Sequence, residues 1–129
     1  GSSTIGGGFS NAAHDRGSVV VGGYYNTAHG QFSVVAGGYA NFAAEPIEGG
    51  TEGYATVAGG YGNKAGGQWS FVGGGMSNFA TGDTSLVAAG KRVRVAMYVC
   101  TECVCMYECL YACMHVSVEG MNECICPHR

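Results

Sequence analysis

Residues Ser18–Phe32 read SVVVGGYYNTAHGQF, and this fifteen-residue stretch is one copy of a unit that recurs along the chain. Written as a pattern, the unit is S-x-V-x-G-G-x-x-N-x-A-x-G-x-x. Its clearest mark is an asparagine whose copies are 15, 15, 22 and 15 residues apart, so one unit carries a seven-residue insertion. These asparagines are Asn11, Asn26, Asn41, Asn63 and Asn78. A short fixed period predicts a repeat protein whose units stack, because one unit is too small to bury a core alone.

Within each unit, apolar or small residues alternate with variable ones. Ser18, Val20 and Gly22 fall on one side of this alternation, and Val19 and Val21 fall on the other. A period of two is typical of a β-strand. The Asn-x-Ala half of the unit repeats the alternation more weakly, so each unit is expected to supply two short strands joined by glycine turns.

The expected fold class is all-β, a parallel β-solenoid or β-roll of 15-residue coils over residues 1–92, followed by a Cys-rich tail over residues 93–129. A sixth unit begins at Ser85 but has Val93 where its asparagine should be, so the array is expected to end near Gly90. Stacking places equivalent residues about 4.8 Å apart, which turns each column into a ladder. The inward ladders are Ser, Val and Ala, a thin core for a lone chain.

Two outward columns of the repeat are rich in aromatic residues. One column comprises Phe9, Tyr24, Tyr39, Tyr61 and Met76, and the other comprises Phe32, Tyr54 and Trp69. Apolar ladders of this size predict burial between chains.

Composition excludes several classes of function. Charged residues make up 12% of the chain, about half the fraction in an ordinary domain, and the net charge of −3 gives no electrostatic footprint for nucleic acid or an anionic membrane. The sequence has no run of 18 apolar residues, so direct membrane insertion is not expected. The Gly-rich strings belong to the repeat and no helix is expected after them, which argues against phosphate binding. Every serine of the array is a repeat position, and neither an enzyme nor a cofactor of the roll is expected.

The glycine-paired units, with their Ser-x-Val and Asn-x-Ala halves, resemble the head repeats of trimeric autotransporter adhesins of the YadA type. The resemblance covers residues 3–92 and includes Ala-Ala-Gly-Lys-Arg at residues 88–92, which is similar to the last head repeat of such arrays. Similar repeats occur in tail-fibre-like proteins that carry a self-cleaving chaperone domain. The resemblance implies a left-handed β-roll, a homotrimer with its core between three chains, and a place at the cell surface or outside the cell.

The asparagine column allows two interpretations. Stacked Asn side chains can hydrogen-bond along the fibre axis and suit turns, or a row of amides can bind glycan. His14 and His29 share a column three residues after the asparagine, so a metal-binding or pH-sensitive patch stands beside the simpler interpretation of solvated surface side chains.

The seven-residue insertion lies between Ala44 and Tyr54. It contains Pro46, which cannot donate to a ladder, and it is acidic, so an exposed loop is expected. Such a loop is either a binding site or a tolerated decoration. The candidate ligand residues are Glu45, Glu48 and Glu52.

All seven cysteines lie after residue 92. A zinc site is one interpretation, because Cys-x-x-Cys and Cys-x-Cys-Pro-His spacings suit zinc. An odd number of cysteines also suits disulfides with one free or intermolecular thiol, as in a secreted fibre. The candidate metal ligands are Cys100, Cys103, Cys124, Cys126 and His128.

The tail also has a four-residue period, seen in Met-Tyr-Val-Cys at residues 97–100 and Met-Tyr-Glu-Cys at residues 106–109. A repeated ATGT tetranucleotide encodes Met-Tyr-Val-Cys, so a third interpretation is translated intron or microsatellite sequence. If the tail folds, residues 97–104 have the Val and Tyr content of a strand that extends the roll.

Two functions follow from these observations. The first is a surface fibre or adhesin head that attaches to a host or matrix ligand. The second is a structural or ligand-templating solenoid, such as a coat, tail-fibre-like or ice-binding protein, with a cross-linking or zinc-binding tail. The threonines do not form the complete flat column that ice binding needs, which favours the first function.

Overall fold

The computed structural model describes residues 1–45, 53–98, 113–118 and 121–125, and within them the chain is all-β, with no helix. The strands of one sheet are β1 (Thr4–Ile5), β3 (Val19–Val20), β5 (Val34–Val35), β7 (Thr56–Val57), β9 (Phe71–Val72) and β11 (Leu86–Val87). The strands of the other are β2 (Ala12–Ala13), β4 (Thr27–Ala28), β6 (Phe42–Ala43), β8 (Lys64–Ala65), β10 (Phe79–Ala80), β12 (Val93–Tyr98), β13 (Cys113–Val118) and β14 (Met121–Ile125).

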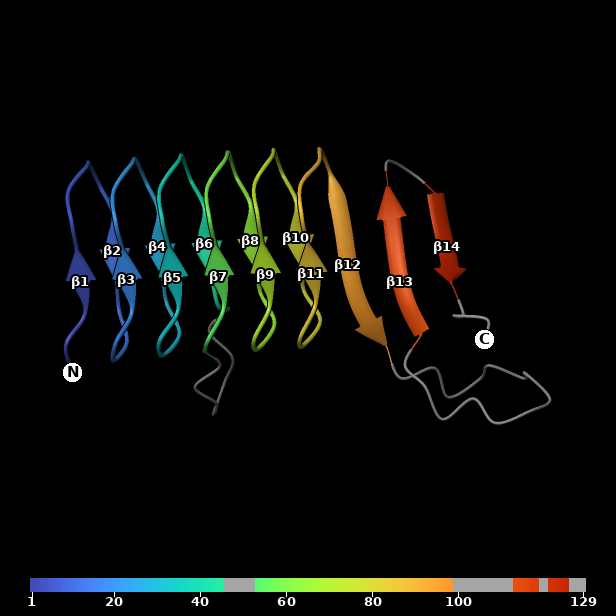
Figure 1. The fold of residues 1–129 in the computed structure, drawn as a ribbon, viewed down its shortest axis with the longest axis horizontal. Helices are drawn as coiled ribbons and strands as arrows, with labels where there is room; N and C mark the ends of the chain where they lie inside the picture. The colour runs from blue at the N-terminus through green and yellow to red at the C-terminus, as the bar shows by residue number, and fades with distance from the viewer. Residues whose placement is uncertain (46–52, 99–112, 119–120, 126–129) are drawn as a thin grey trace.

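Each repeat unit forms one coil with a two-residue strand in each sheet, which confirms the predicted solenoid (Figure 1). Successive coils pair in parallel, so that Val20 lies beside Val35 in the first sheet and Ala28 beside Ala43 in the second. The fifteen-residue period is therefore the length of one coil. Strands two residues long cannot be stable alone, and they persist here because every coil is hydrogen-bonded to its neighbours.

The strands on either side of residues 46–52 keep the register of the array. Val35 pairs with Val57 and Ala43 with Ala65, an offset of 22 residues instead of 15 in both sheets. The seven extra residues are thus accommodated between β6 and β7 without a shift in the ladders. Residues 46–52 themselves lie outside the described part of the chain.

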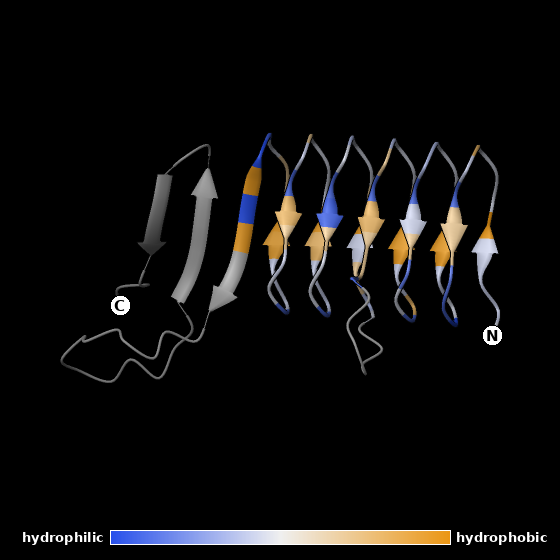
Figure 2. Cartoon of the chain, turned by 180° about the vertical axis from the view of Figure 1, so that it is seen from behind, coloured by the Kyte–Doolittle hydropathy of each residue, from blue (hydrophilic) through white to orange (hydrophobic). Residues whose placement is uncertain are grey.

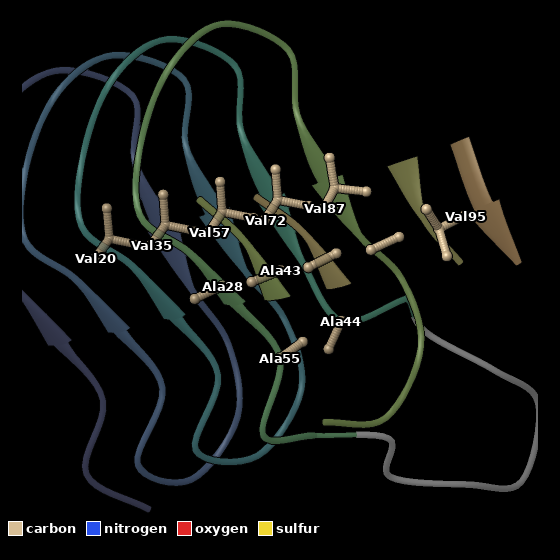
Figure 3. Packing of buried hydrophobic residues seen from close by; sticks show 12 residues of the cluster. Val20, Ala28, Val35, Ala43, Ala44, Ala55, Val57, Val72, Val87 and Val95 are labelled. Atoms are coloured by element: carbon tan, nitrogen blue, oxygen red, sulfur yellow. The ribbon is translucent and has the colours of Figure 1, made fainter. Parts of the chain in front are cut away.

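A narrow core of small side chains runs along the axis between the two sheets (Figure 3). It consists of valines from the first sheet facing alanines from the second, with Ala44, Ala55 and Val95 beside them. All twelve core residues are Val or Ala, whereas thirteen large hydrophobic side chains of the described residues are exposed. The expectation of a thin core is therefore confirmed, and no Phe, Tyr, Trp, Met, Leu or Ile side chain of the described residues belongs to it.

Both edges of the coil turn through residues in the left-handed backbone region. Tyr25 has φ of 56° at one edge, and Phe32, Tyr54 and Trp69 have φ of 53°, 62° and 54° at the other. This conformation is uncommon for bulky residues. It is held by hydrogen bonds between coils, such as the Tyr25 N–H donating to the Phe9 carbonyl at 3.0 Å and the Tyr54 N–H donating to the Gln31 carbonyl at 2.8 Å.

The sixth coil continues past the end predicted from the sequence. The Val93 N–H donates to Asn78 Oδ1 at 2.9 Å, and β12 then pairs in parallel with β10, which brings Val95 into the core. Pairing with the preceding coil thus reaches Val95, whereas the sequence placed the end of the array near Gly90 and the start of the tail at residue 93. The Asn78 side chain needs only a backbone N–H donor from the next coil, and Val93 supplies this N–H as well as an asparagine would.

After the sixth coil the direction of pairing changes. β12 pairs antiparallel with β13, and β13 antiparallel with β14, which adds two strands to the second sheet (Figure 1). Val93 has no side-chain amide, so the asparagine column cannot continue to a further coil. Of the strand predicted over residues 97–104, residues 97 and 98 form the end of β12, where they pair with β13 and not with the last coil, and residues 99–104 lie outside the described residues.

Candidate binding surfaces

The five asparagines form a continuous hydrogen-bonded column inside one edge of the roll. The Oδ1 atom of each asparagine accepts from the backbone N–H of the next, as from Asn26 to Asn11 at 2.9 Å and from Asn63 to Asn41 at 3.0 Å. Each Nδ2 group donates to two glycine carbonyls, which for Asn63 are those of Gly59 and Gly75, both at 2.9 Å.

This arrangement uses the hydrogen-bonding groups of the asparagine side chains within the protein. Asn26, Asn63 and Asn78 are fully buried, and Asn41 is 1% exposed. A glycan could reach these amides only by displacing the bonds that join the coils. The column therefore has the geometry of a structural element, as the hydrogen-bonding interpretation expects.

The outer face of the first sheet is uncharged along all six coils. Two columns of side chains form it: Thr4, Val19, Val34, Thr56, Phe71 and Leu86, and beside them Gly6, Val21, Ala36, Ala58, Gly73 and Ala88. Leu86 and Val21 are more than half exposed. A flat apolar face of this length is characteristic of a surface that contacts another molecule.

The outer face of the second sheet has a different chemistry. One of its columns comprises Ala12, Thr27, Phe42, Lys64, Phe79 and Arg94. The Lys64 ammonium lies 5.6 Å from the Phe42 ring centroid and the Arg94 guanidinium lies 5.0 Å from that of Phe79. In Figure 2, the blue of β8 and β12 interrupts an otherwise apolar or neutral row. Sequence reasoning missed these cation–π pairs, although the alternation of Phe with Lys or Arg in this column was a usable signal.

The first aromatic column, together with Tyr25, forms an exposed ridge that is here called the tyrosine edge. The ridge comprises Phe9, Tyr24, Tyr25, Tyr39, Tyr61 and Met76. The rings of Tyr39 and Tyr61 are parallel, with centroids 5.1 Å apart. Tyr25 belongs to a different column, and its edge-to-face contacts with Phe9 and Tyr39, at 5.9 and 5.7 Å, add it to the ridge. Column alignment alone did not predict this addition.

The second aromatic column lies on the opposite edge and consists of Phe32, Tyr54 and Trp69. The ring centroids are 5.4 Å apart for Phe32 and Tyr54 and 6.0 Å apart for Tyr54 and Trp69, with interplanar angles of 21° and 25°. The rings follow one another along the axis, and all three side chains remain exposed, at 43%, 49% and 54%.

Of the three predicted loop carboxylates, only Glu45 lies in the described residues. Its carboxylate forms an ion pair with Lys64, on the outer face of the second sheet. This exposed pair contributes little to stability. Glu48 and Glu52 lie outside the described residues.

The candidate metal ligands of the tail fall almost entirely outside the described residues. The residues outside them are Cys100, Cys103, Cys126 and His128. Cys124 is a residue of β14. Among the residues that the structure describes, no group of three or more His, Cys, Asp or Glu side chains lies together.

His14 and His29 are neighbours on the outer face of the second sheet, as their shared column predicted. Their ring centroids are 5.1 Å apart. The structure thus brings together two imidazoles from successive coils.

Comparison with known proteins gives no family assignment. No protein-family model matches the chain, and no curated protein matches it. In the described part of the chain, no helix is long and apolar enough to span a membrane. The repetitive β-solenoid is therefore the property on which a function must be argued.

Proposed function

We propose that this chain is a non-enzymatic, homotrimeric head of a surface fibre, similar to the YadA-type adhesin heads that its repeats resemble, and that it attaches to protein or glycan ligands of a host or matrix. The observation that carries the proposal is the uncharged outer face of the first sheet. Because the core of one chain contains only Val and Ala, burial of this face between chains would supply apolar contact that a single coil cannot provide.

The outer faces of the two sheets differ in charge, as a trimer with one face of each roll turned inward requires. Three rolls around a common axis each turn one face inward, where an unpaired charge would be costly to desolvate. The first sheet has no charge on its outer face, whereas the second sheet carries Lys64 and Arg94. The first sheet is therefore the face assigned to the interface, and the second sheet and the exposed edges are left for ligands at the cell surface.

A binding assay tests the attachment function. The full chain, with its thiols alkylated to prevent capture through cysteine, is immobilised and exposed to a panel of extracellular-matrix proteins and glycans. The folded trimer is expected to bind at least one of them saturably, and about 10²-fold more tightly than single subunits, because three linked sites bind together.

The control for this assay is the Gly23→Ala chain, whose destabilisation is argued in the Discussion, used at a temperature at which circular dichroism shows it unfolded and the native chain folded. Binding by the native chain that this variant lacks supports attachment by the folded roll. Equal binding by both chains, or no binding by a folded trimer to any member of the panel, contradicts the proposed function.

A further inference from the structure

The pair formed by His14 and His29 has features that neither the fold nor the proposed function requires. Each histidine follows the second-sheet strand of its coil, and its backbone N–H donates to the next coil, from His14 to the Ala28 carbonyl at 3.0 Å and from His29 to the Ala43 carbonyl at 2.9 Å. The two backbones are therefore fixed relative to each other. In the described part of the chain, neither imidazole makes a hydrogen bond.

The surroundings of the pair leave both imidazoles accessible. His14 is exposed and His29 is half-buried, with its ring stacked on that of Phe42 at 6.5 Å and 19°. The same column continues with Ala44, Gly66 and Thr81, so no cation follows the histidines along it. The charged residues nearest in sequence are Asp15 and Arg16, which lie in the turn after His14.

We propose that His14 and His29 together bind one divalent transition-metal ion, such as Ni²⁺, Cu²⁺ or Zn²⁺, on the outer face of the first two coils. Imidazole is a preferred ligand of these ions. With metal–nitrogen bonds of about 2.0–2.1 Å, two imidazoles at right-angle or tetrahedral positions of one ion have ring centroids roughly 4.5–5 Å apart. The observed separation is 5.1 Å, and the rings are inclined at 39° to each other instead of stacked flat.

The site would couple metal binding to the stacking of the coils. Its two ligands come from different coils, so they are adjacent only while the first coil is stacked on the second. Of the coils that the structure describes, the first is stacked against a neighbour on one side only, and at this end of the described roll Ile5 is 48% exposed although its counterparts in later coils are buried. Bound metal should therefore stabilise this end, since it binds the folded state in preference to the unfolded state.

Isothermal titration of the full, thiol-alkylated chain with NiCl₂ tests the proposal. The parent is expected to bind one Ni²⁺ per chain at this site. His14→Asn and His29→Asn should each weaken this binding at least tenfold, because each removes one arm of a chelate. The control His115→Asn, which replaces a histidine of β13 far along the second sheet, should leave this binding unchanged.

Similar weakening by the two single variants supports a shared site. Binding that matches the parent in either variant, or half the stoichiometry with unchanged affinity, overturns the proposal, because the histidines would then act separately or not at all. A second measurement guards against a folding defect: Ni²⁺ should raise the melting temperature of the parent and not that of the His14→Asn/His29→Asn chain, with both chains β-rich by circular dichroism.

Discussion

Gly23→Ala is expected to destabilise the roll strongly, whereas Gly22→Ala, the same change one residue earlier, leaves its stability nearly unchanged. Gly23 has φ of 87°, and an added Cβ would meet the Gly38 carbonyl oxygen of the next coil and lie 2.6 Å from Asn26 Nδ2. A left-handed alanine costs about 1–2 kcal/mol. The backbone clash adds to this cost, because the coils cannot separate without breaking their hydrogen bonds.

The expected loss for Gly23→Ala is at least about 3 kcal/mol, a large part of the 5–15 kcal/mol that stabilises a typical domain. At Gly22 an added Cβ meets nothing within 4 Å, so the expected change is within about 0.5 kcal/mol. Urea unfolding followed by far-UV circular dichroism measures both. Equal midpoints for the two variants would show that the glycine carbonyls are not stacked as closely as described.

Asn63→Asp is expected to destabilise the roll by about 4 kcal/mol or more. The buried Asn63 amide donates to the carbonyls of Gly59 and Gly75. A carboxylate would instead place a negatively charged acceptor against two carbonyl oxygens, in a site without solvent to compensate. Asn63→Ala should cost about 3 kcal/mol, since it removes three hydrogen bonds and leaves the Asn78 N–H without its acceptor.

The pH dependence of stability separates these two variants. Burial against carbonyl groups should raise the pKa of an introduced aspartate in the folded state, so the folded state would bind a proton more readily than the unfolded state. Asn63→Asp should then regain stability, relative to Asn63→Ala, as the pH falls through the raised pKa.

Asn11→Ala is the control for the buried position, because Asn11 occupies the same column but is only partly buried. This substitution should cost about 1 kcal/mol. Equal losses at Asn11 and Asn63, or no pH dependence, would contradict the buried column.

The sequence was sufficient to predict the coil, because the same pattern of residues recurs from unit to unit. A column such as Asn11 to Asn78 carries the same signal five times, and the alternation around Val20 and Ala28 indicates which side faces inward. The period then fixes which residues are neighbours, so the adjacency of His14 and His29 and the two aromatic ladders were predictable before any coordinates.

Other features could not be predicted because they depend on backbone bonds or on side-chain direction. Val93 lacks the amide that marks the repeat, yet its N–H completes the sixth coil. Tyr25 joins the tyrosine edge because its left-handed backbone turns the ring toward Phe9 and Tyr39. The proposed trimer and its ligand depend on contacts outside one chain, so the contacts within a single chain cannot test them.

The proposed interface can be probed with a matched pair of lysine substitutions. Val34→Lys places a charge on the uncharged outer face of the first sheet, whereas Thr27→Lys places one on the second sheet, in the column that already holds Lys64. Val34→Lys should dissociate the trimer and Thr27→Lys should not, with β-rich circular dichroism in both. Dissociation by Thr27→Lys alone would assign the interface to the second sheet.

Assembly of the roll into a trimer is the central claim, and the solution mass of the full chain tests it most directly. Multi-angle light scattering under reducing conditions excludes disulfide-linked species. A β-rich particle of about 40 kDa, three times the 13.2 kDa of one chain, is the predicted result. A stable, β-rich particle of 13.2 kDa would contradict the claim, because the roll would then stand alone with its apolar face in water.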